Sequence, residues 1–298
     1  MDNRKYEALI TVAETGSITR AAGQMGYTQS GITQMIKGLE SELGLTLLTR
    51  TNRGVSLTNA ARELLPLMRE EQRADERIRQ HCAVLTGKTA GKINIGCLSS
   101  VSESWMPSVL ETLASRYPGI KVSTLEHETP MLLELLADGR LDMALCEITQ
   151  KEAAFDTVKL HTDEIIAIVP KEHELAGRDS VTLRELSEYP FITYSFGETS
   201  LGYPGWPEAI VKRKVRLNIA YSCKDNLTVM KMIDHNLGVS LASQLIMQNY
   251  NTSAVRLHLD PPIYRSIGIV KRALEKDLPA ASAFTTCLLE YIKAEYNR

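Results

Sequence analysis

The sequence predicts an α/β protein with an N-terminal winged helix-turn-helix, a long linker helix and a C-terminal bilobed α/β unit. Three observations predict it: two short helical patterns joined at a glycine near the N-terminus, one long helical pattern over residues 58–86, and alternating strand and helix patterns after it. The 298 residues suggest two or three domains, and 44% of them are hydrophobic, as in ordinary globular proteins. The formal net charge is −2, so any contact with nucleic acid must come from a local surface.

The first helix is predicted over residues 4–14 and the second over residues 18–25. The hydroxyl of Ser17 can cap the second helix by accepting a hydrogen bond from a free backbone N–H group. Gly26 follows this helix and suits the tight, left-handed backbone of a turn. The pattern therefore predicts a sharp joint directly after residue 25.

The third helix is predicted to start after Thr28, whose hydroxyl can cap it, and to pack against the second. Ala22 is small where the two helices must approach, and Ile32 is placed to point back into the joint. A small residue, a glycine and an aliphatic residue at these offsets are typical of a helix-turn-helix. A helical hairpin inside a core is the alternative that this pattern leaves open. The apolar face of the third helix is Ile32, Ile36, Leu39 and Leu43.

The outer face of the third helix favours DNA contact over that alternative. It carries hydrogen-bonding side chains long enough to reach base edges, and Lys37 is placed for a phosphate. A merely solvated helix would more often show Glu/Lys pairs. The predicted DNA-binding residues of the helical part are Ser17, Thr28, Gln29, Ser30, Thr33, Gln34 and Lys37.

A β-hairpin is predicted over residues 45–58, because two short β-prone runs flank the turn signal Asn52-Arg53-Gly54. A hairpin directly after a recognition helix is a wing. Arg53 at its tip can enter a minor groove, whose negative potential favours arginine, and Arg50 can hold a phosphate. A solvated arginine is the alternative at each position.

One long helix is predicted over residues 58–86, with Pro66 as a point of bending. Glu71 and Asp75 fall on its apolar seam and weaken it mid-way. A lone helix cannot bury such a stripe, so a partner helix is implied. The seam consists of Leu57, Ala61, Leu64, Met68, Ile78, Cys82 and Leu85.

The remaining chain alternates between strands and helices in two rounds. The first round has the strands "KINIGC", "KVSTLEH" and "LDMALC", and the second has "IIAIVP", "PFITYS", "VRLNIAYS", "GVSLAS" and "SIGIVK". This alternation predicts parallel sheets with helices on their faces, and the chain crosses between the lobes near 161–164 and 265–268. The predicted domains are the winged helix-turn-helix 1–58, the linker and hinge 59–90, and 91–298, with lobe I at 91–161 and 268–298 and lobe II at 162–267.

The segments "VAETGSITRAA", "YTQSGITQMIKGLESELGLTLLTR" and "GVSLTNAA" resemble the DNA-binding part of LysR-type transcriptional regulators. Weaker matches follow in the family's order: "GKINIGCL", "RYPGIKV", "LLADGRLDMALC", "VPKEHELAG" and "NLGVSLAS". The resemblance implies a sequence-specific transcriptional regulator that binds promoter or operator DNA as a homodimer or homotetramer paired through its linker helices. It also implies a periplasmic-binding-protein-like effector domain whose small-molecule ligand modulates activity.

Five departures from the family pattern are visible. The family usually has an aromatic residue where Leu48 stands and a glycine where Ala61 and His127 stand; it often has a proline where Glu174 stands and an arginine where Gln34 stands. The first three concern packing or local backbone. The last concerns which operator sequence is preferred, not DNA binding itself.

The effector is predicted to bind in a cleft between the lobes, because open α/β sheets bind ligands beyond the carboxyl ends of their strands. The resembled family contacts effectors at the positions of Ser99, Ser100 and Thr129. Helix N-termini offer free N–H groups, which favours a carboxylate or an aromatic acid. Plain helix capping is the alternative role of these hydroxyls, and both roles can coexist. The predicted effector-binding residues are Ser99, Ser100, Val101, Thr129 and Glu147 from lobe I, and Thr193, Tyr194, Phe196, Asn226 and Val239 from lobe II.

The sequence is less typical of two other function classes, an enzyme and a solute-binding or sensor protein. An enzyme would need a catalytic set, but the best candidates, His127 between two glutamates and His161 near Asp163, show neither a metal-ligand spacing nor a nucleophile-base pattern. No phosphate-binding loop is present, so neither cofactor nor metal is expected. A solute-binding or sensor protein without a DNA role would not need residues 1–58. Tyr203 and Trp206 can stack on an aromatic effector or pack under their own loop.

Location and redox state follow from what the sequence lacks. It shows no secretory signal and no apolar run of membrane-spanning length, and its five cysteines have no CxxC spacing. We therefore expect a cytoplasmic protein with buried free thiols. The spacing does not favour a redox-sensing cysteine.

Overall fold

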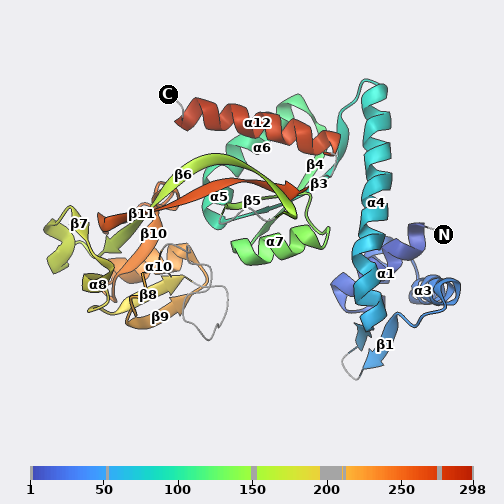
Figure 1. Cartoon of the computed structure of the whole chain (residues 1–298), viewed down its shortest axis with the longest axis horizontal. Coiled ribbons are helices and arrows are strands. Elements are labelled where there is room, and N and C mark those ends of the chain that lie inside the picture. Colours follow the sequence, from blue (N-terminus) through green and yellow to red (C-terminus); the bar gives the residue numbers. More distant parts are fainter. Residues whose placement is uncertain are drawn as a thin grey trace. The chain divides into compact units, whose positions relative to one another are not determined.

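The structure is a computed structural model (Figure 1) that describes residues 3–51, 54–148, 153–194, 210, 213–273 and 277–296; for residues 50 and 51 it describes only the backbone. The chain divides into two compact units. The N-terminal unit is Met1–Gly91 with Asp138–Arg140, and the C-terminal unit is Lys92–Ala137 with Leu141–Arg298. No helix among the described residues has the length and apolar character needed to cross a membrane.

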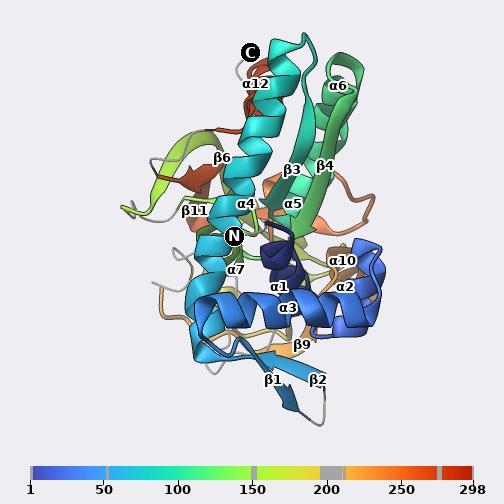
Figure 2. The ribbon, with the colours of Figure 1, turned by 90° about the vertical axis from the view of Figure 1, so that its right-hand side faces the viewer.

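The N-terminal unit begins with three helices, α1 (Asn3–Thr15), α2 (Ile18–Met25) and α3 (Gln29–Leu43). Figure 2 shows α1 beside the long helix α4 and α3 lying across the unit. The predicted caps are confirmed: the backbone N–H of Arg20 donates to the Ser17 hydroxyl at 3.3 Å, and that of Gly31 donates to Thr28 at 3.1 Å. Gly26 has φ +71°, the left-handed conformation that ends α2 and turns the chain toward α3.

The joint between α2 and α3 is packed as the sequence predicts. Ala22 is 4% exposed and Ile32 is fully buried in one cluster, which also holds Ala8 and Val12 of α1. Ile36 continues this face of α3, while Leu39 reaches a second cluster shared with α1 and α4. The three helices therefore pack against one another through these two clusters, and the opposite face of α3 is exposed to solvent.

A two-stranded antiparallel hairpin follows α3. Strand β1 (Leu48–Thr51) pairs with β2 (Gly54–Leu57), with Leu48 opposite Leu57. The hydroxyls of Thr49 and Ser56, which are opposite one another, are hydrogen bonded at 2.8 Å. Leu48 and Leu57 both pack against the helical core, which fixes the hairpin to it. The predicted wing is confirmed as a hairpin.

Helix α4 (Asn59–Leu85) runs through Pro66 as one element. The first half of its apolar seam packs on the helix-turn-helix core through Ala61 and Met68, together with Leu65, which the predicted seam omitted. The second half is uncovered in the single chain: Ile78 is 64% exposed and Leu85 is 86% exposed. Within the single chain, therefore, the first half of this stripe is covered and these residues of the second half are not.

The first lobe of the C-terminal unit is a sheet with helices on both faces (Figure 1). Side chains alternate along β5, so that Met143 and Leu145 face α6 and α12 while Ala144 and Cys146 face α7. Trp105 fills the first of these cores. The elements are β3 (Ala90–Cys97), α5 (Ser99–Ser104), α6 (Met106–Arg116), β4 (Gly119–Glu126), α7 (Thr129–Ala137), β5 (Met143–Glu147) and α12 (Pro279–Tyr296).

The second lobe is built in the same way. Ile165 and Ala167 face one core, and Ile166 and Ile168 face the other, beneath α10. The elements are η1 (Glu174–Gly177), β7 (Ser180–Val181), α8 (Leu183–Leu186), β8 (Phe191–Tyr194), β9 (Ile219–Cys223), α10 (Asn226–Asp234), β10 (Ser240–Ser243) and α11 (Gln244–Met247).

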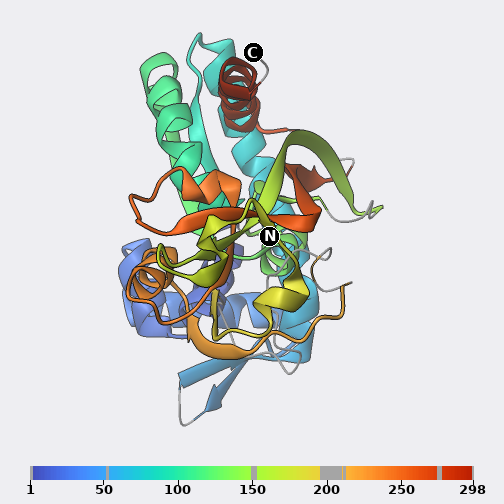
Figure 3. The same ribbon diagram turned by 90° about the vertical axis from the view of Figure 1, so that its left-hand side faces the viewer.

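Two long strands join the lobes, β6 (Phe155–Val169) and β11 (Val255–Arg272), which run side by side in Figures 1 and 3. They pair antiparallel, and so do β11 with β5 and β10 with β6. The prediction of purely parallel sheets was therefore incomplete: β3 and β5 are parallel, but one mixed sheet of order β10-β6-β11-β5-β3-β4 spans both lobes. The last helix, α12, packs on α6 of the first lobe.

Candidate DNA-contacting surface and effector cleft

The outer face of α3 carries most of the predicted DNA-contacting side chains. Gln29, Ser30, Gln34 and Lys37 are exposed, and Thr33 is half-buried. Their exposure follows from the helical period, since Ile32, Ile36 and Leu39 take the opposite face into the core. The surface is therefore polar and largely exposed, and it carries one positive charge, that of Lys37.

The hydroxyls and the longer side chains of this face differ in their partners. Thr28 caps α3 and its hydroxyl is 3.0 Å from that of Ser30, while Thr33 donates to the carbonyl of Gln29 at 2.8 Å. Among the described residues, the side chains of Gln29, Gln34 and Lys37 have no hydrogen-bond partner. These three keep their donors and acceptors available.

The remaining predicted contacts lie at the capped turn and in the wing. Ser17 is half-buried and caps α2. Arg50 stands in β1, while Arg53 lies outside the described residues. Tyr27, which is 38% exposed, stands directly before Thr28.

A cavity of about 110 Å³ opens between the two lobes of the C-terminal unit. It lies beyond the carboxyl ends of β3, β4 and β8, beside the start of α10. This is the edge of the sheets at which the sequence predicted a ligand. Leu98, Ile165, Leu241 and Ile246 provide apolar wall, and Arg265 of β11 reaches it from the crossing strands. The other polar lining residues are Ser99, Ser100, His127 and Glu128 of the first lobe, and Tyr194, Asn226 and Ser243 of the second.

Four of the ten predicted effector residues line this cavity: Ser99, Ser100, Tyr194 and Asn226. The amide of Asn226 donates to the Ser99 hydroxyl at 3.4 Å, which links α10 of the second lobe to α5 of the first. Arg265 donates from Nη2 to the Ser100 hydroxyl at 2.8 Å. Both serine hydroxyls thus already hold contacts with groups that come from other elements of the cleft.

Five other predicted residues, all described in the structure, do not line the cavity. Val101 and Val239 are fully buried in the cores of their lobes, and Thr193 is 4% exposed, because the strand alternation turns it away from the side of Tyr194. Thr129 lies beside the cavity and accepts a hydrogen bond from the backbone N–H of Glu147 at 3.2 Å. Phe196, with Tyr203 and Trp206, lies outside the described residues.

Arg265 forms a buried ion pair that the sequence analysis missed. Its Nη2 is 2.7 Å and its Nε is 2.9 Å from Oδ2 of Asp163, which is 1% exposed. The other oxygen of Asp163 accepts the backbone N–H of Leu245 at 3.0 Å. Asp163 and Arg265 carry opposite charges, and each lies beside an apolar strand segment. This was a signal in the sequence that could have revealed the pair.

His127 and Glu128 supply the remaining polar wall of the first lobe. The backbone N–H of Glu128 donates to Nδ1 of His127 at 2.9 Å, so Nε2 is the ring nitrogen that carries the proton in a neutral ring. Burial raises the pKa of Tyr194 to about 12. A hydrogen bond with Ser99 lowers this pKa, and the charge of Glu128 raises it. Tyr194 therefore stays a neutral phenol in a negative field.

Contacts on one side of the cleft also join the lobes. The hydroxyl of Tyr250 donates to Glu103 with oxygen distances of 2.8 and 3.0 Å, and Asn249 donates to the hydroxyl of Ser104 at 2.8 Å. Burial raises the pKa of Glu103, while the bond to Tyr250 lowers it. These contacts hold α5 of the first lobe against the end of α11.

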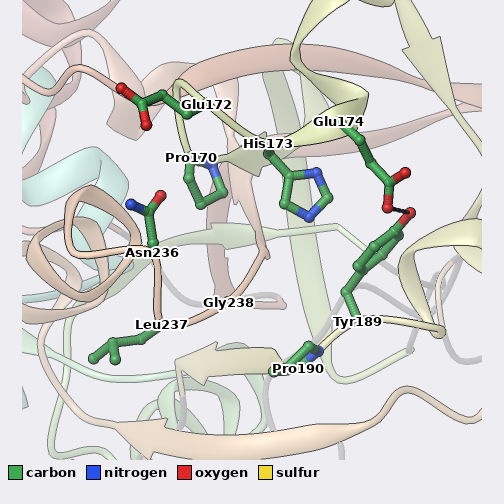
Figure 4. Close-up of a pocket in the computed structure, with 9 residues that line it drawn as sticks. All are labelled: Pro170, Glu172, His173, Glu174, Tyr189, Pro190, Asn236, Leu237 and Gly238. Carbon is green, nitrogen blue, oxygen red and sulfur yellow. Dashed lines mark hydrogen bonds between the residues drawn. The ribbon is translucent and has the colours of Figure 1, made fainter.

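A second cavity, of about 390 Å³, lies in the second lobe and contains none of the predicted residues (Figure 4). Tyr189 donates to Glu174 at 2.6 Å, and its ring meets that of His173 edge-on, with centroids 4.5 Å apart. Burial lowers the pKa of His173, and its Nδ1 accepts the N–H of Leu175. Glu172 adds a carboxylate to the same wall.

Comparison with protein families decides what the two units are. Residues 3–62 match the model of the bacterial regulatory helix-turn-helix protein, lysR family, and residues 86–293 match the LysR substrate binding domain. The chain belongs to the LysR family. As a LysR protein it is a DNA-binding transcriptional regulator with an effector-binding domain, and not an enzyme.

Relatives cover this LysR protein along nearly its whole length. It is 27% identical over 289 residues to the probable regulator LrrA of Synechococcus elongatus, covering 97% of this chain and 96% of LrrA. A full-length OxyR variant from Pseudomonas aeruginosa is similar in fold, with a TM-score of 0.76 at 19% identity, covering 98% of this chain and 95% of OxyR. Full-length CbnR solved with its target DNA has a TM-score of 0.64 at 18% identity, covering 98% of this chain and 100% of CbnR.

Proposed function

We propose that this LysR protein binds its operator through the outer face of α3, with Gln29, Gln34 and Lys37 as the main contacts. The observation that carries the proposal is the exposure of these three side chains on the face opposite the buried Ile32. Glutamine amides reach base edges in the major groove, and a lysine neutralises a phosphate. Ser17, Thr28, Ser30 and Thr33 fix the helix ends and backbone, Arg50 stands in β1 of the wing, and Arg53 is proposed as a contact from the sequence alone.

Two such chains pair through α4. The exposed half of its stripe, with Ile78 and Leu85, gains cover only from a second helix. In the effector domain, β4 is an edge strand with an exposed Leu125, and β9 carries the exposed Tyr221. Pairing through such edges extends a dimer to a dimer of dimers, and two recognition helices per dimer read a roughly palindromic site. A regulator of this kind works in the cytoplasm, where the chromosome is.

The cleft between the lobes holds the effector, a small carboxylate. Hydroxyls of Ser99 and Ser100 and the amide of Asn226 converge there, as donors for the acid's oxygens. Within the described residues, Nη1 of Arg265 has no acceptor, while its Nε and Nη2 are occupied. The cavity of about 110 Å³ is smaller than the roughly 150 Å³ cavity that accepts benzene, so an aromatic acid requires the lobes to open further.

Effector binding acts by a population shift. A ligand that contacts both Ser99 and Asn226 stabilises the arrangement in which the two lobes are close. The size of the shift is set by the difference between the ligand's affinities for the close and the open arrangement. The lobe arrangement then biases how paired effector domains pack, and with it the spacing of the DNA-binding units.

A gel-shift titration tests the DNA-binding role. The full chain is titrated against the DNA upstream of its own gene and against a scrambled fragment of equal length, at two salt concentrations. Preferential binding of the upstream DNA that weakens steeply with salt is expected. Equal affinity for both fragments would contradict sequence-specific regulation at this site.

A further inference from the structure

Tyr27 stands at the joint between α2 and α3. Gly26 ends α2 and Thr28 caps α3, so the two helices meet on either side of this residue. The backbone N–H of Tyr27 donates to the carbonyl of Ala22 at 2.9 Å, which holds its main chain against the end of α2. The side chain therefore projects from a fixed point at the start of the helix that carries the predicted DNA contacts.

The ring of Tyr27 lies beside the first turn of α3. A methyl group at Gly31 would lie 3.9 Å from Cδ1 and 4.0 Å from Cβ of Tyr27. Gly31 and Gln34 are three residues apart, which makes them neighbours on the surface of a helix. Tyr27 therefore stands at the N-terminal end of α3, on the flank of the exposed face that carries Gln34.

The hydroxyl of Tyr27 differs from the other hydroxyls at this end of the helix. That of Thr28 accepts the backbone N–H of Gly31 at 3.1 Å and is 3.0 Å from that of Ser30. Tyr27 is 38% exposed, and within the described part of the chain its hydroxyl has no hydrogen-bond partner. Its O–H is therefore available to a group outside the protein.

A DNA phosphate is the group that this position favours. Sugar-phosphate backbones form both edges of the major groove, so a side chain on the flank of an inserted helix meets phosphate before it meets a base. Tyrosine is among the side chains that donate to phosphate oxygens in protein–DNA complexes. A hydrogen bond to an ionised oxygen is short and about twice as strong as a neutral one. The phenol supplies such a bond without adding a positive charge.

We propose that the Tyr27 hydroxyl donates a hydrogen bond to a DNA phosphate at the edge of the major groove. The contact sets the register of α3 on the duplex and leaves the reading of bases to the face with Gln29 and Gln34. The inference names a contact outside the predicted set and rests on the proposed entry of α3 into the groove. If the ring only packs on α3, the hydroxyl has no part in binding, and this is what the test separates.

The test is Tyr27→Phe, which removes the hydroxyl and keeps the ring. The full chain is titrated by fluorescence anisotropy against the upstream and the scrambled DNA across a salt series. We expect about tenfold weaker binding to both, because a bond to phosphate carries no sequence information, and an unchanged salt slope, because no cation is lost. Thermal melts should match those of the unmodified chain. Tyr264→Phe removes a hydroxyl from an exposed tyrosine of β11 and should keep the full affinity.

Ethylation interference on the upstream DNA identifies the phosphate. With the unmodified chain, ethylation of the contacted phosphate should weaken binding; with Tyr27→Phe this interference should disappear while the others remain. Full affinity in Tyr27→Phe, or loss of its preference for upstream DNA, would overturn the inference. If the variant Gln29→Ala/Lys37→Ala also binds like the unmodified chain, the proposed function fails as well. If that variant binds more weakly and Tyr27→Phe does not, the inference fails alone.

Discussion

Asp163 and Arg265 face each other across the two strands that join the lobes. They are register partners in β6 and β11, and their side chains form an ion pair of 2.7 Å at 1% and 12% exposure. Because Arg265 also reaches Ser100 of the first lobe and Asp163 reaches the backbone of Leu245 in the second, one ion pair fixes the junction from both sides.

Removing one partner of this pair should be costly. We expect Asp163→Asn to lower the free energy of unfolding by about 3–5 kcal/mol, since it leaves Arg265 buried without its counter-ion. Urea denaturation of the full chain measures it. Arg178→Ala breaks an exposed pair with Glu185 and should cost at most about 1 kcal/mol. Equal costs for both variants would argue against a structural role of the buried pair.

Two glycines of the helix-turn-helix should respond in opposite directions to the same substitution. An added methyl group meets no atom within 4 Å at Gly23 or at Gly26, but Gly23 is inside α2 while Gly26 has φ +71°. Gly23→Ala should stabilise the protein by about 0.5–1 kcal/mol. Gly26→Ala should destabilise it by about 1–2 kcal/mol. Thermal melts of both variants, compared at one scan rate, check the sign; two shifts in the same direction would refute the assigned backbone.

The exposed half of the α4 stripe should control oligomerisation. Ile78→Glu places a charge in the expected helix–helix contact, and we expect it to shift the protein toward monomer in sedimentation velocity. Leu289→Glu introduces the same charge at another partly exposed leucine, on α12, and serves as the control. A dimer that persists in Ile78→Glu at micromolar concentration would place the interface elsewhere.

Thiol labelling should separate the cysteines by burial. The expectation of buried thiols was wrong for Cys82, which is exposed, while Cys97 and Cys146 are buried. Burial raises the pKa of Cys97 to about 11 and that of Cys146 to about 12, so neither forms the reactive thiolate at neutral pH. In the Ile78→Glu variant, in which α4 is expected to be unpaired, iodoacetamide at pH 8 should modify Cys82 before Cys97 and Cys146, as read by peptide mass spectrometry. Early labelling of Cys97 or Cys146 would contradict the packing of the first lobe.

The local features of the fold could be predicted from the sequence, because their determinants are close along the chain. Ser17 and Gly26 bracket α2 and set its limits at the residues predicted. The strand directions could not be predicted, since β6 and β11 are far apart along the chain and the alternation of strand and helix does not encode their pairing.

The sequence predicted a residue that lines the cleft only where the end of a single strand determines the position of that residue. Ser99 and Asn226 follow strand ends and line the cavity, whereas Val101 is turned into the core by the short helix α5. Arg265 was missed because its position in the cleft depends on Asp163 of another strand.

The central claim, that the polar face of α3 enters the major groove, is tested most directly by fluorescence anisotropy with upstream and scrambled DNA across a salt series. For the double variant Gln29→Ala/Lys37→Ala we predict loss of the preference for upstream DNA and a salt slope lower by about one. Lys293→Ala, which removes a lysine from α12, should keep both. A double variant with the affinity, preference and salt slope of the unmodified chain would contradict the claim.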